Sequence, residues 1–298
     1  MIKHFINAAR LRTLPLSVSG IIVGSALAWY DEHKNILISL LAILTTIGFQ
    51  IISNFANDYG DGVKGTDNIN RIGPKRAIQS GIITPKQMKK AIIISLIITF
   101  GFALSLIYIA FGKDHLKLSV LFILLGILSL ISAIKYTVGK NAYGYSGLGD
   151  VFVFLFFGLL STLGSYFLYT KNLNLKVLYP AISVGLLSVA VLNLNNMRDI
   201  ENDKIARKNT IVVKIGSQNA KIYHTFLIII SFISSLFFTY FFINKAISYL
   251  FIIAYIPLFI HLKKVYQIKN HKDFDPELKK VALSTFFFSI LFAIGLLL

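Results

Sequence analysis

Asparagine and aspartate side chains recur at helical spacing in two stretches of this chain. The first set consists of Asn54, Asn57, Asp58 and Asp61. The second set consists of Asn195, Asn196, Asp199 and Asp203. Steps of three and four residues place the members of each set on one face of a helix. Each set follows a long apolar run, where a carboxylate is costly to keep and usually serves a function. We call the two sets the first and second Asp ladders.

The side-chain donors of both ladders are oxygen atoms, with no histidine or cysteine among them. Such ligands suit Mg²⁺, which keeps several waters and bridges to substrate phosphates instead of occupying an all-protein cage. Two facing ladders therefore predict a metal-bridged polyphosphate between them. The predicted metal ligands are Asp58, Asp61, Asp199 and Asp203, with Asp67 in the following loop as a looser fifth candidate.

Lysine and arginine residues accompany both ladders. They are suited to neutralise the phosphate charge that the metal leaves. The candidates are Lys64, Arg71, Lys75, Arg76, Arg198, Arg207 and Lys208. Each has a structural alternative, because basic residues in loops often only set membrane topology, just as Asn and Asp near helix ends often cap them.

The composition identifies the class of protein that carries the ladders. The 298 residues are 55% hydrophobic and 14% charged, with a mean hydropathy of +0.71, whereas soluble domains are about 25% charged. The chain is therefore predicted to be an all-α integral membrane protein. Its lack of cysteine excludes disulfides and thiol nucleophiles. We attribute the net charge of +17 to topology and anionic lipid headgroups, and expect no nucleic-acid partner.

Nine apolar segments are each close to the ~17–25 residues that cross a bilayer. They lie at about residues 15–30, 37–56, 91–112, 116–134, 148–170, 176–195, 222–243, 246–264 and 281–298. They predict a single domain over residues 1–298, built as a bundle of nine transmembrane helices.

The basic residues predict the orientation of this bundle. Only six of the 30 Lys and Arg residues fall on the side opposite the N-terminus, namely Lys34, Lys113, Lys117, Lys171, Lys176 and Lys245. Positive loops stay in the cytoplasm of a cell membrane. We therefore expect the N-terminus and both ladders on the cytoplasmic face and the C-terminus outside.

Several motifs resemble the UbiA superfamily of membrane prenyltransferases. Asn57 to Asp61, followed by Asp67 and paired with Asp199-x-x-x-Asp203, resembles its two Asp-rich motifs. Tyr136 to Lys140 resembles its Tyr-x-x-x-Lys element, and nine spans match its fold. The superfamily often places a third acid four residues after the second, but that position is Gly65 here, so the role of Asp67 is less firmly implied than those of Asp58 and Asp61.

Within the superfamily, the resemblance is to the branch that prenylates 1,4-dihydroxy-2-naphthoate. It rests on Arg10–Pro15, Arg71–Ala77, Tyr143–Asp150, Asn195–Asp199 and Lys208–Thr210. These matches run from about residue 8 to 216, and the last three spans offer only an apolar pattern.

The resemblance implies a Mg²⁺-dependent transfer of a polyprenyl group from its diphosphate to 1,4-dihydroxy-2-naphthoate. Carbon dioxide and diphosphate leave, and demethylmenaquinone results. The site is expected to open laterally to lipid, which accommodates the tail. Lys140 would join the four ladder aspartates as a catalytic residue. The expected substrate contacts are Asn54, Asn57, Arg71, Lys75, Arg76, Tyr136, Tyr143, Tyr145, Asn195, Asn196, Arg198 and Lys208.

Two other functions stay open at this point. One is the same reaction with another acceptor, such as 4-hydroxybenzoate, homogentisate or a haem precursor. The other is an ion-coupled transporter, since intramembrane acids also mark ion pathways. Transporters place such acids near the bilayer midplane, whereas here they lie at helix ends beside basic loops. The six histidines are scattered along the sequence, and we assign none of them a catalytic role.

Overall fold

The computed structural model describes residues 2–65, 76–139 and 142–298. All regular secondary structure in these residues is helical, and nine segments are long and apolar enough to cross a membrane. This confirms the predicted all-α bundle. The principal helices are α1 (Ile2–Ala9), α2 (Leu14–Tyr30), α3 (Ile36–Lys64), α4 (Pro85–Phe111), α5 (Leu116–Lys135), α6 (Gly149–Val153), α7 (Ser161–Thr170), α8 (Leu178–Arg198), α9 (Ile200–Ile205), α10 (Ile211–Phe238), α11 (Ile252–Gln267) and α12 (Phe274–Leu297).

Shorter elements lie within the spans or in the loops beside them. The π-helical turn η3 (Phe154–Leu160) joins α6 to α7 within the fifth span. The 3-10 turn η7 (His271–Asp273) leads into α12, and η2 (Tyr143–Tyr145) lies in the loop before α6. π-Helical turns are rare and frequently occur at functional sites.

Several helices begin earlier than their apolar segments predicted. The third span starts at Pro85 instead of residue 91, because Thr84 and Gln87 form a capping box and proline is favoured in the first turn. The seventh starts at Ile211 instead of residue 222, capped by Thr210 and kinked at Gly216. Hydropathy marks only the part of a helix that lipid covers, whereas caps mark where the helix begins.

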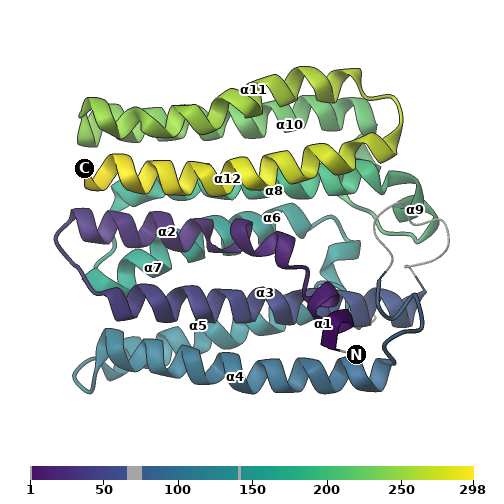
Figure 1. Cartoon of the computed structure of the whole chain (residues 1–298), viewed down its shortest axis with the longest axis horizontal. Coiled ribbons are helices and arrows are strands. Elements are labelled where there is room, and N and C mark those ends of the chain that lie inside the picture. The colour runs from purple at the N-terminus through teal and green to yellow at the C-terminus, as the bar shows by residue number, and fades with distance from the viewer. Residues whose placement is uncertain (1, 66–75, 140–141) are drawn as a thin grey trace.

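Figure 1 shows the helices lying side by side along the long axis of the molecule. The last turns of α3 and α8, which carry the two Asp ladders, lie at the same end as α9. The N-terminus lies toward this end and the C-terminus lies at the other, as an odd number of spans requires. The bundle therefore brings together two ladders that are separated by about 140 residues in the sequence.

Close packing of small residues holds α2 against α7. A Cβ atom at Gly20 would lie 1.9 Å from Ser161 Oγ, and one at Gly24 would lie 1.9 Å from Ser165 Oγ. Membrane helices pack through such small residues because lipid offers little hydrophobic driving force between helices. In contrast, α5 buries none of its residues and forms an outer wall of the bundle.

Candidate active site

Lys208 joins the two Asp ladders. Its Nζ lies 3.6 Å from Asp203 Oδ1. Burial alone would lower the pKa of Lys208, but Asp203, Tyr136 and Asp61 raise it above the usual value. One ammonium group therefore acts on acids from both ladders, as expected for a single shared site.

Asp61 is the acid of the first ladder that faces this site. Its Oδ2 accepts a hydrogen bond from Arg76 Nη1 at 2.6 Å, and its Oδ1 accepts one from the Tyr145 hydroxyl at 2.9 Å. The same Arg76 nitrogen also donates to the Asn57 carbonyl at 2.9 Å. Three predicted site residues, Asp61, Arg76 and Tyr145, are thus in direct contact.

The other members of the first ladder make different contacts. Asp58 accepts hydrogen bonds from the backbone N–H groups of Ala77 (3.1 Å) and Ile78 (3.3 Å), so it fixes the segment that carries Arg76. The Asn54 amide donates to the Ala9 carbonyl at 2.8 Å and so ties α3 to the N-terminal segment. The metal-binding role of Asp58 and the substrate contact of Asn54 stay predictions.

Arg198 organises the second ladder. Its guanidinium donates to both carboxylate oxygens of Asp199, from Nε at 2.9 Å and from Nη2 at 2.7 Å. Nη2 also donates to Asn195 Oδ1 at 2.8 Å, and Nη1 donates to Asp275 in the first turn of α12. Arg198 is only 2% exposed, so these acceptors compensate a buried charge.

Asp203 and Asn196 each keep a side-chain oxygen without a partner. Asp203 Oδ2 and Asn196 Oδ1 are buried and make no hydrogen bond within the described residues. Burial raises the pKa of Asp203 to about 6; Lys208 opposes this shift, while Asp199 and Asp61 add to it. Asp203 therefore presents an oxygen that a ligand can use.

Three tyrosines lie between the ladder residues and an apolar cavity. The Tyr143 hydroxyl donates to the Ser132 carbonyl at 2.9 Å, and its ring stacks on Phe152 with centroids 4.0 Å apart. Tyr136 and Tyr143 both line the cavity described next, whereas Tyr145 contacts Asp61. Lys64 Nζ lies 4.2 Å from the centroid of the Tyr145 ring.

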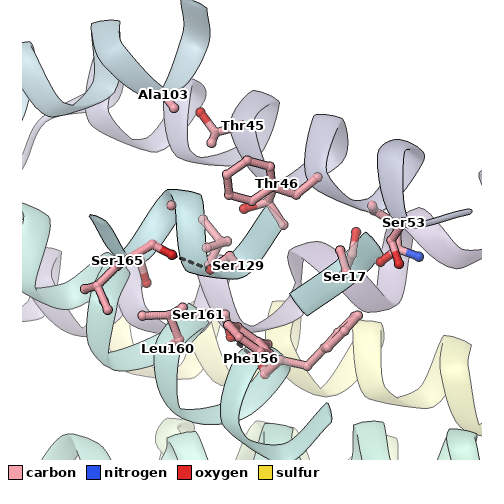
Figure 2. A pocket seen from close by; sticks show the side chains of 18 of the residues that line it. Ser17, Thr45, Thr46, Ser53, Ala103, Ser129, Phe156, Leu160, Ser161 and Ser165 are labelled. Atoms are coloured by element: carbon pink, nitrogen blue, oxygen red, sulfur yellow. Dashed lines mark hydrogen bonds between the residues drawn. The ribbon is translucent and has the colours of Figure 1, made fainter. Parts of the chain in front are cut away.

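An apolar cavity of about 370 Å³ runs along the helices from the ladder end. On α3 its lining extends from Asn57 to Ala42, a length of about 22 Å at ~1.5 Å per residue. Figure 2 shows Ser17 of α2, Ser53 of α3, Ser129 of α5 and Phe156 of η3 around it. Most of the lining is aliphatic or aromatic, which suits a long hydrocarbon chain.

Four predicted residues lie outside the described part of the chain. They are Asp67, Arg71, Lys75 and Lys140.

Sequence reasoning missed two sets of contacts. Thr137 donates to Ala56 O and to Asn57 Oδ1, both at 3.2 Å, and so joins the end of α5 to the first ladder. Asp275 contacts Arg198 across 77 residues of sequence, in a span that showed only an apolar pattern. A threonine inside a matched motif was available as a signal, but no local pattern pointed to Asp275.

Two histidines that are distant in sequence also meet in the structure. His224 and His261 lie with their Nε2 atoms 2.9 Å apart, between α10 and α11. These two residues are 37 positions apart in the sequence, so no local pattern indicated that they meet. The pair belongs to the last three spans, outside the ladder site.

The oxygen donors fit Mg²⁺ when it is held partly by substrate. In the described ranges, no group of three or more His, Cys, Asp or Glu side chains gathers as a metal cage. Mg²⁺ is usually bound by one or two carboxylates together with waters and substrate phosphates. The buried, unpartnered Oδ2 of Asp203, close to Lys208 and Asp199, matches that requirement.

The chain is similar in sequence to characterised enzymes along its whole length. It is 41% identical over 296 residues to the 1,4-dihydroxy-2-naphthoate octaprenyltransferase of Escherichia coli K12, covering 99% of this chain and 96% of that enzyme. The Haemophilus influenzae enzyme of the same name is 41% identical, covering 100% and 96%.

Solved structures share the fold. A UbiA homologue from Aeropyrum pernix has a TM-score of 0.71 at 12% identity, covering 96% of this chain and 97% of that one. A homologue from Archaeoglobus fulgidus, solved with DMAPP and Mg²⁺, has a TM-score of 0.63 at 13% identity, covering 98% and 99%. The model of the UbiA prenyltransferase family matches residues 17–292. This chain therefore belongs to the UbiA prenyltransferase family.

Proposed function

We propose that this protein transfers a polyprenyl group from its diphosphate to 1,4-dihydroxy-2-naphthoate. The observation that carries the proposal is the 41% identity, over nearly the full length, to two enzymes named for this acceptor. The arrangement of the site supports it, since two acidic ladders and an apolar cavity meet at one end of the bundle.

The ladder end suits the diphosphate. Lys208 and Arg76 offer positive charge beside Asp61 and Asp203, and charge-assisted hydrogen bonds to phosphate are strong. Asp61, Asp199 and Asp203 are the residues that would hold Mg²⁺, and Asp58 stays a further candidate ligand. When bound, Mg²⁺ would stabilise the negative charge that grows on the leaving diphosphate.

The cavity suits the prenyl tail. Burial of a hydrocarbon chain is favourable by about 0.8 kcal/mol per methylene. Phe122, Leu125 and Ser129 of α5 form one wall, and this helix has no buried residues and is therefore bordered by lipid. A tail longer than the cavity can leave past this wall into the bilayer, which supports the predicted lateral opening.

The reaction joins the two substrates at the boundary between ladder and cavity. The carbon–oxygen bond of the allylic diphosphate breaks, and the electron pair leaves with diphosphate. The ring carbon that bears the carboxylate then forms the new carbon–carbon bond, and the carboxylate leaves as carbon dioxide. The product is the quinol form of demethylmenaquinone. Tyr136, Tyr143 and Phe152 line the adjoining cavity and would shield the cation from water.

One assay tests the reaction and its acceptor. The purified protein in lipid nanodiscs receives Mg²⁺, radiolabelled polyprenyl diphosphate and, separately, 1,4-dihydroxy-2-naphthoate, 4-hydroxybenzoate or homogentisate. We expect labelled product only with the naphthoate. Product with another acceptor alone would overturn the acceptor assignment, and uptake by proteoliposomes without bond formation would favour a transporter.

We also propose that the ladder end of this multi-pass membrane protein faces the cytoplasm. The distribution of Lys and Arg supports this orientation. Because the chain has no cysteine, single cysteines introduced at Lys34 and at Lys272 report the two ends cleanly. In intact cells, an impermeant thiol reagent should label the residue 34 variant and spare the residue 272 variant; the reverse pattern contradicts the proposal.

A further inference from the structure

The guanidinium of Arg198 is shared between a ladder acid and the last span. Nε and Nη2 bind Asp199, while Nη1 binds the carboxylate of Asp275. The side chain of Arg198 is 3% exposed and that of Asp275 is 40% exposed. Asp275 lies in the first turn of α12, where the helix dipole favours a negative charge.

The start of α12 is fixed to its neighbours by other contacts. Glu277 is fully buried and accepts hydrogen bonds from His261 Nδ1 of α11 at 2.6 Å and from Lys280 at 2.7 Å. His271 Nδ1 lies 2.8 Å from the Met197 carbonyl, next to Arg198. Asp275 is thus held at a defined place relative to the second ladder, and its contact with Arg198 is not an incidental surface pair.

The net charge of Arg198, Asp199 and Asp275 determines how strongly Asp199 attracts a divalent cation. Arg198 carries one positive charge and contacts two carboxylates, so the three side chains keep one net negative charge. Arg198 and Asp199 already form a buried contact with two hydrogen bonds. Without Asp275 this pair would carry no net charge, and a neutral buried ion pair is hard to separate. Asp199 would then attract a divalent cation more weakly.

We propose that Asp275 is a positioning residue that holds Arg198 from α12 and shares its positive charge, so that Asp199 keeps net negative charge for the divalent cation that accompanies the diphosphate. This inference rests on the proposed function. It gives the C-terminal spans, which carry no ladder residue, a role in setting the cation affinity of the site.

Three variants distinguish the effect of the Asp275 charge from a general effect on the fold. Asp275→Asn keeps an oxygen acceptor for Arg198 but removes the charge, and Asp275→Glu keeps the charge. Asp273→Asn is the matched control, because Asp273 is an exposed acid two residues away whose side chain makes no cap hydrogen bond. All three are made in the full chain, and their thermal unfolding is compared first.

Two readouts test the inference in detergent-solubilised protein. One is Mn²⁺ binding, measured by electron paramagnetic resonance with the unreactive probe geranyl thiodiphosphate; the other is the separation of kcat from the KM for Mg²⁺. We expect Asp275→Asn to weaken Mn²⁺ binding and to raise the KM for Mg²⁺ about fivefold, a size set by the partial exposure of Asp275. Asp275→Glu and Asp273→Asn should stay within twofold of the unaltered protein.

The contrary outcomes are distinct. Equal Mn²⁺ affinity in Asp275→Asn and Asp273→Asn overturns the inference, and so does a fall in kcat with an unchanged KM for Mg²⁺, which would indicate a structural role. If the unaltered protein and Asp273→Asn bind no Mn²⁺ with the diphosphate probe, the result contradicts the proposed function as well as the role of Asp275.

Discussion

The two Asp ladders each consist of two asparagines and two aspartates at helical spacing, but they are supported in different ways. Asp61 of the first ladder is held by Arg76 and Tyr145, both from loops near the ladder end of the bundle. Asp199 of the second is held by its neighbour Arg198, which is anchored in turn by Asp275 of the last span. The first ladder therefore depends on its adjoining loops, whereas the second depends on the C-terminal helices. Similar residue types at helical spacing therefore did not lead to similar surroundings.

The largest effect should come from removing one acid from each ladder. We expect Asp61→Ala and Asp199→Ala each to lower kcat by about 10²–10³, since each removes support for transition-state charge. Glu201→Gln is the control, because this exposed acid lies two residues from Asp203 and pairs with Lys204 at the surface. Steady-state turnover in nanodiscs measures the effect. Near-normal turnover in either alanine variant would contradict the hypothesis that both ladders contribute acids to one active site.

Lys208 tests the connection between the ladders. Lys208→Met should lower kcat/KM for the prenyl diphosphate about 10- to 100-fold, the range for losing a charge-assisted contact. Lys204→Met removes an exposed lysine from the same segment and should leave kcat/KM unchanged. If the two methionine variants behave alike, Lys208 does not join the ladders functionally.

The titration of Asp203 tests how the second ladder differs from the first. Its pKa is raised from 3.8 to about 6, chiefly by burial. A raised acid pKa means that the folded state binds the proton more tightly than the unfolded chain. The resulting stability is complete below about pH 4 and is lost as the pH rises through about 6. Without Mg²⁺, Asp203→Asn should therefore melt above the unaltered protein at about pH 7.5 and match it near pH 4.

The same proton competes with the metal. The Mg²⁺ concentration that gives half-maximal activity should rise up to about tenfold for each pH unit below about 6, because a carboxylate must lose its proton to bind a cation. Kinetic titrations with Mg²⁺ between pH 5 and 8 check this. A requirement for Mg²⁺ that does not change with pH would contradict the assignment of Asp203.

The smallest effect should come from the first ladder's tyrosine. Tyr145→Phe removes the hydrogen bond to Asp61 but keeps the ring near Lys64, so we expect about a threefold to tenfold loss of kcat/KM. Tyr59→Phe is the matched control, because Tyr59 lies on α3 with Asp61 but packs against the hydrophobic cluster around Phe55. An equal loss in both variants would show that Tyr145 supports the fold and not the ladder.

Much of the fold was predictable because its signals are local. Apolar runs of bilayer length indicated nine spans, and the described residues contain nine such helices. Helix starts were less predictable: the cap at Thr84 and the kink at Gly216 lie outside the apolar windows. The proximity of Asp61, Asp203 and Lys208 was predictable from spacing and residue type, since both ladders end their helices on the same side of the bundle.

The sequence by itself determined the chemistry available to this protein: oxygen donors in two ladders, basic residues beside them, and enough apolar helix to enclose a hydrocarbon tail. The tertiary structure decided which donors serve which purpose. It directed Asp61 toward the second ladder and Asp58 toward a loop backbone, and it brought Asp275 to Arg198 across 77 residues. The reason is physical: helical periodicity fixes the face on which a side chain lies, but contacts between helices depend on how the whole bundle packs.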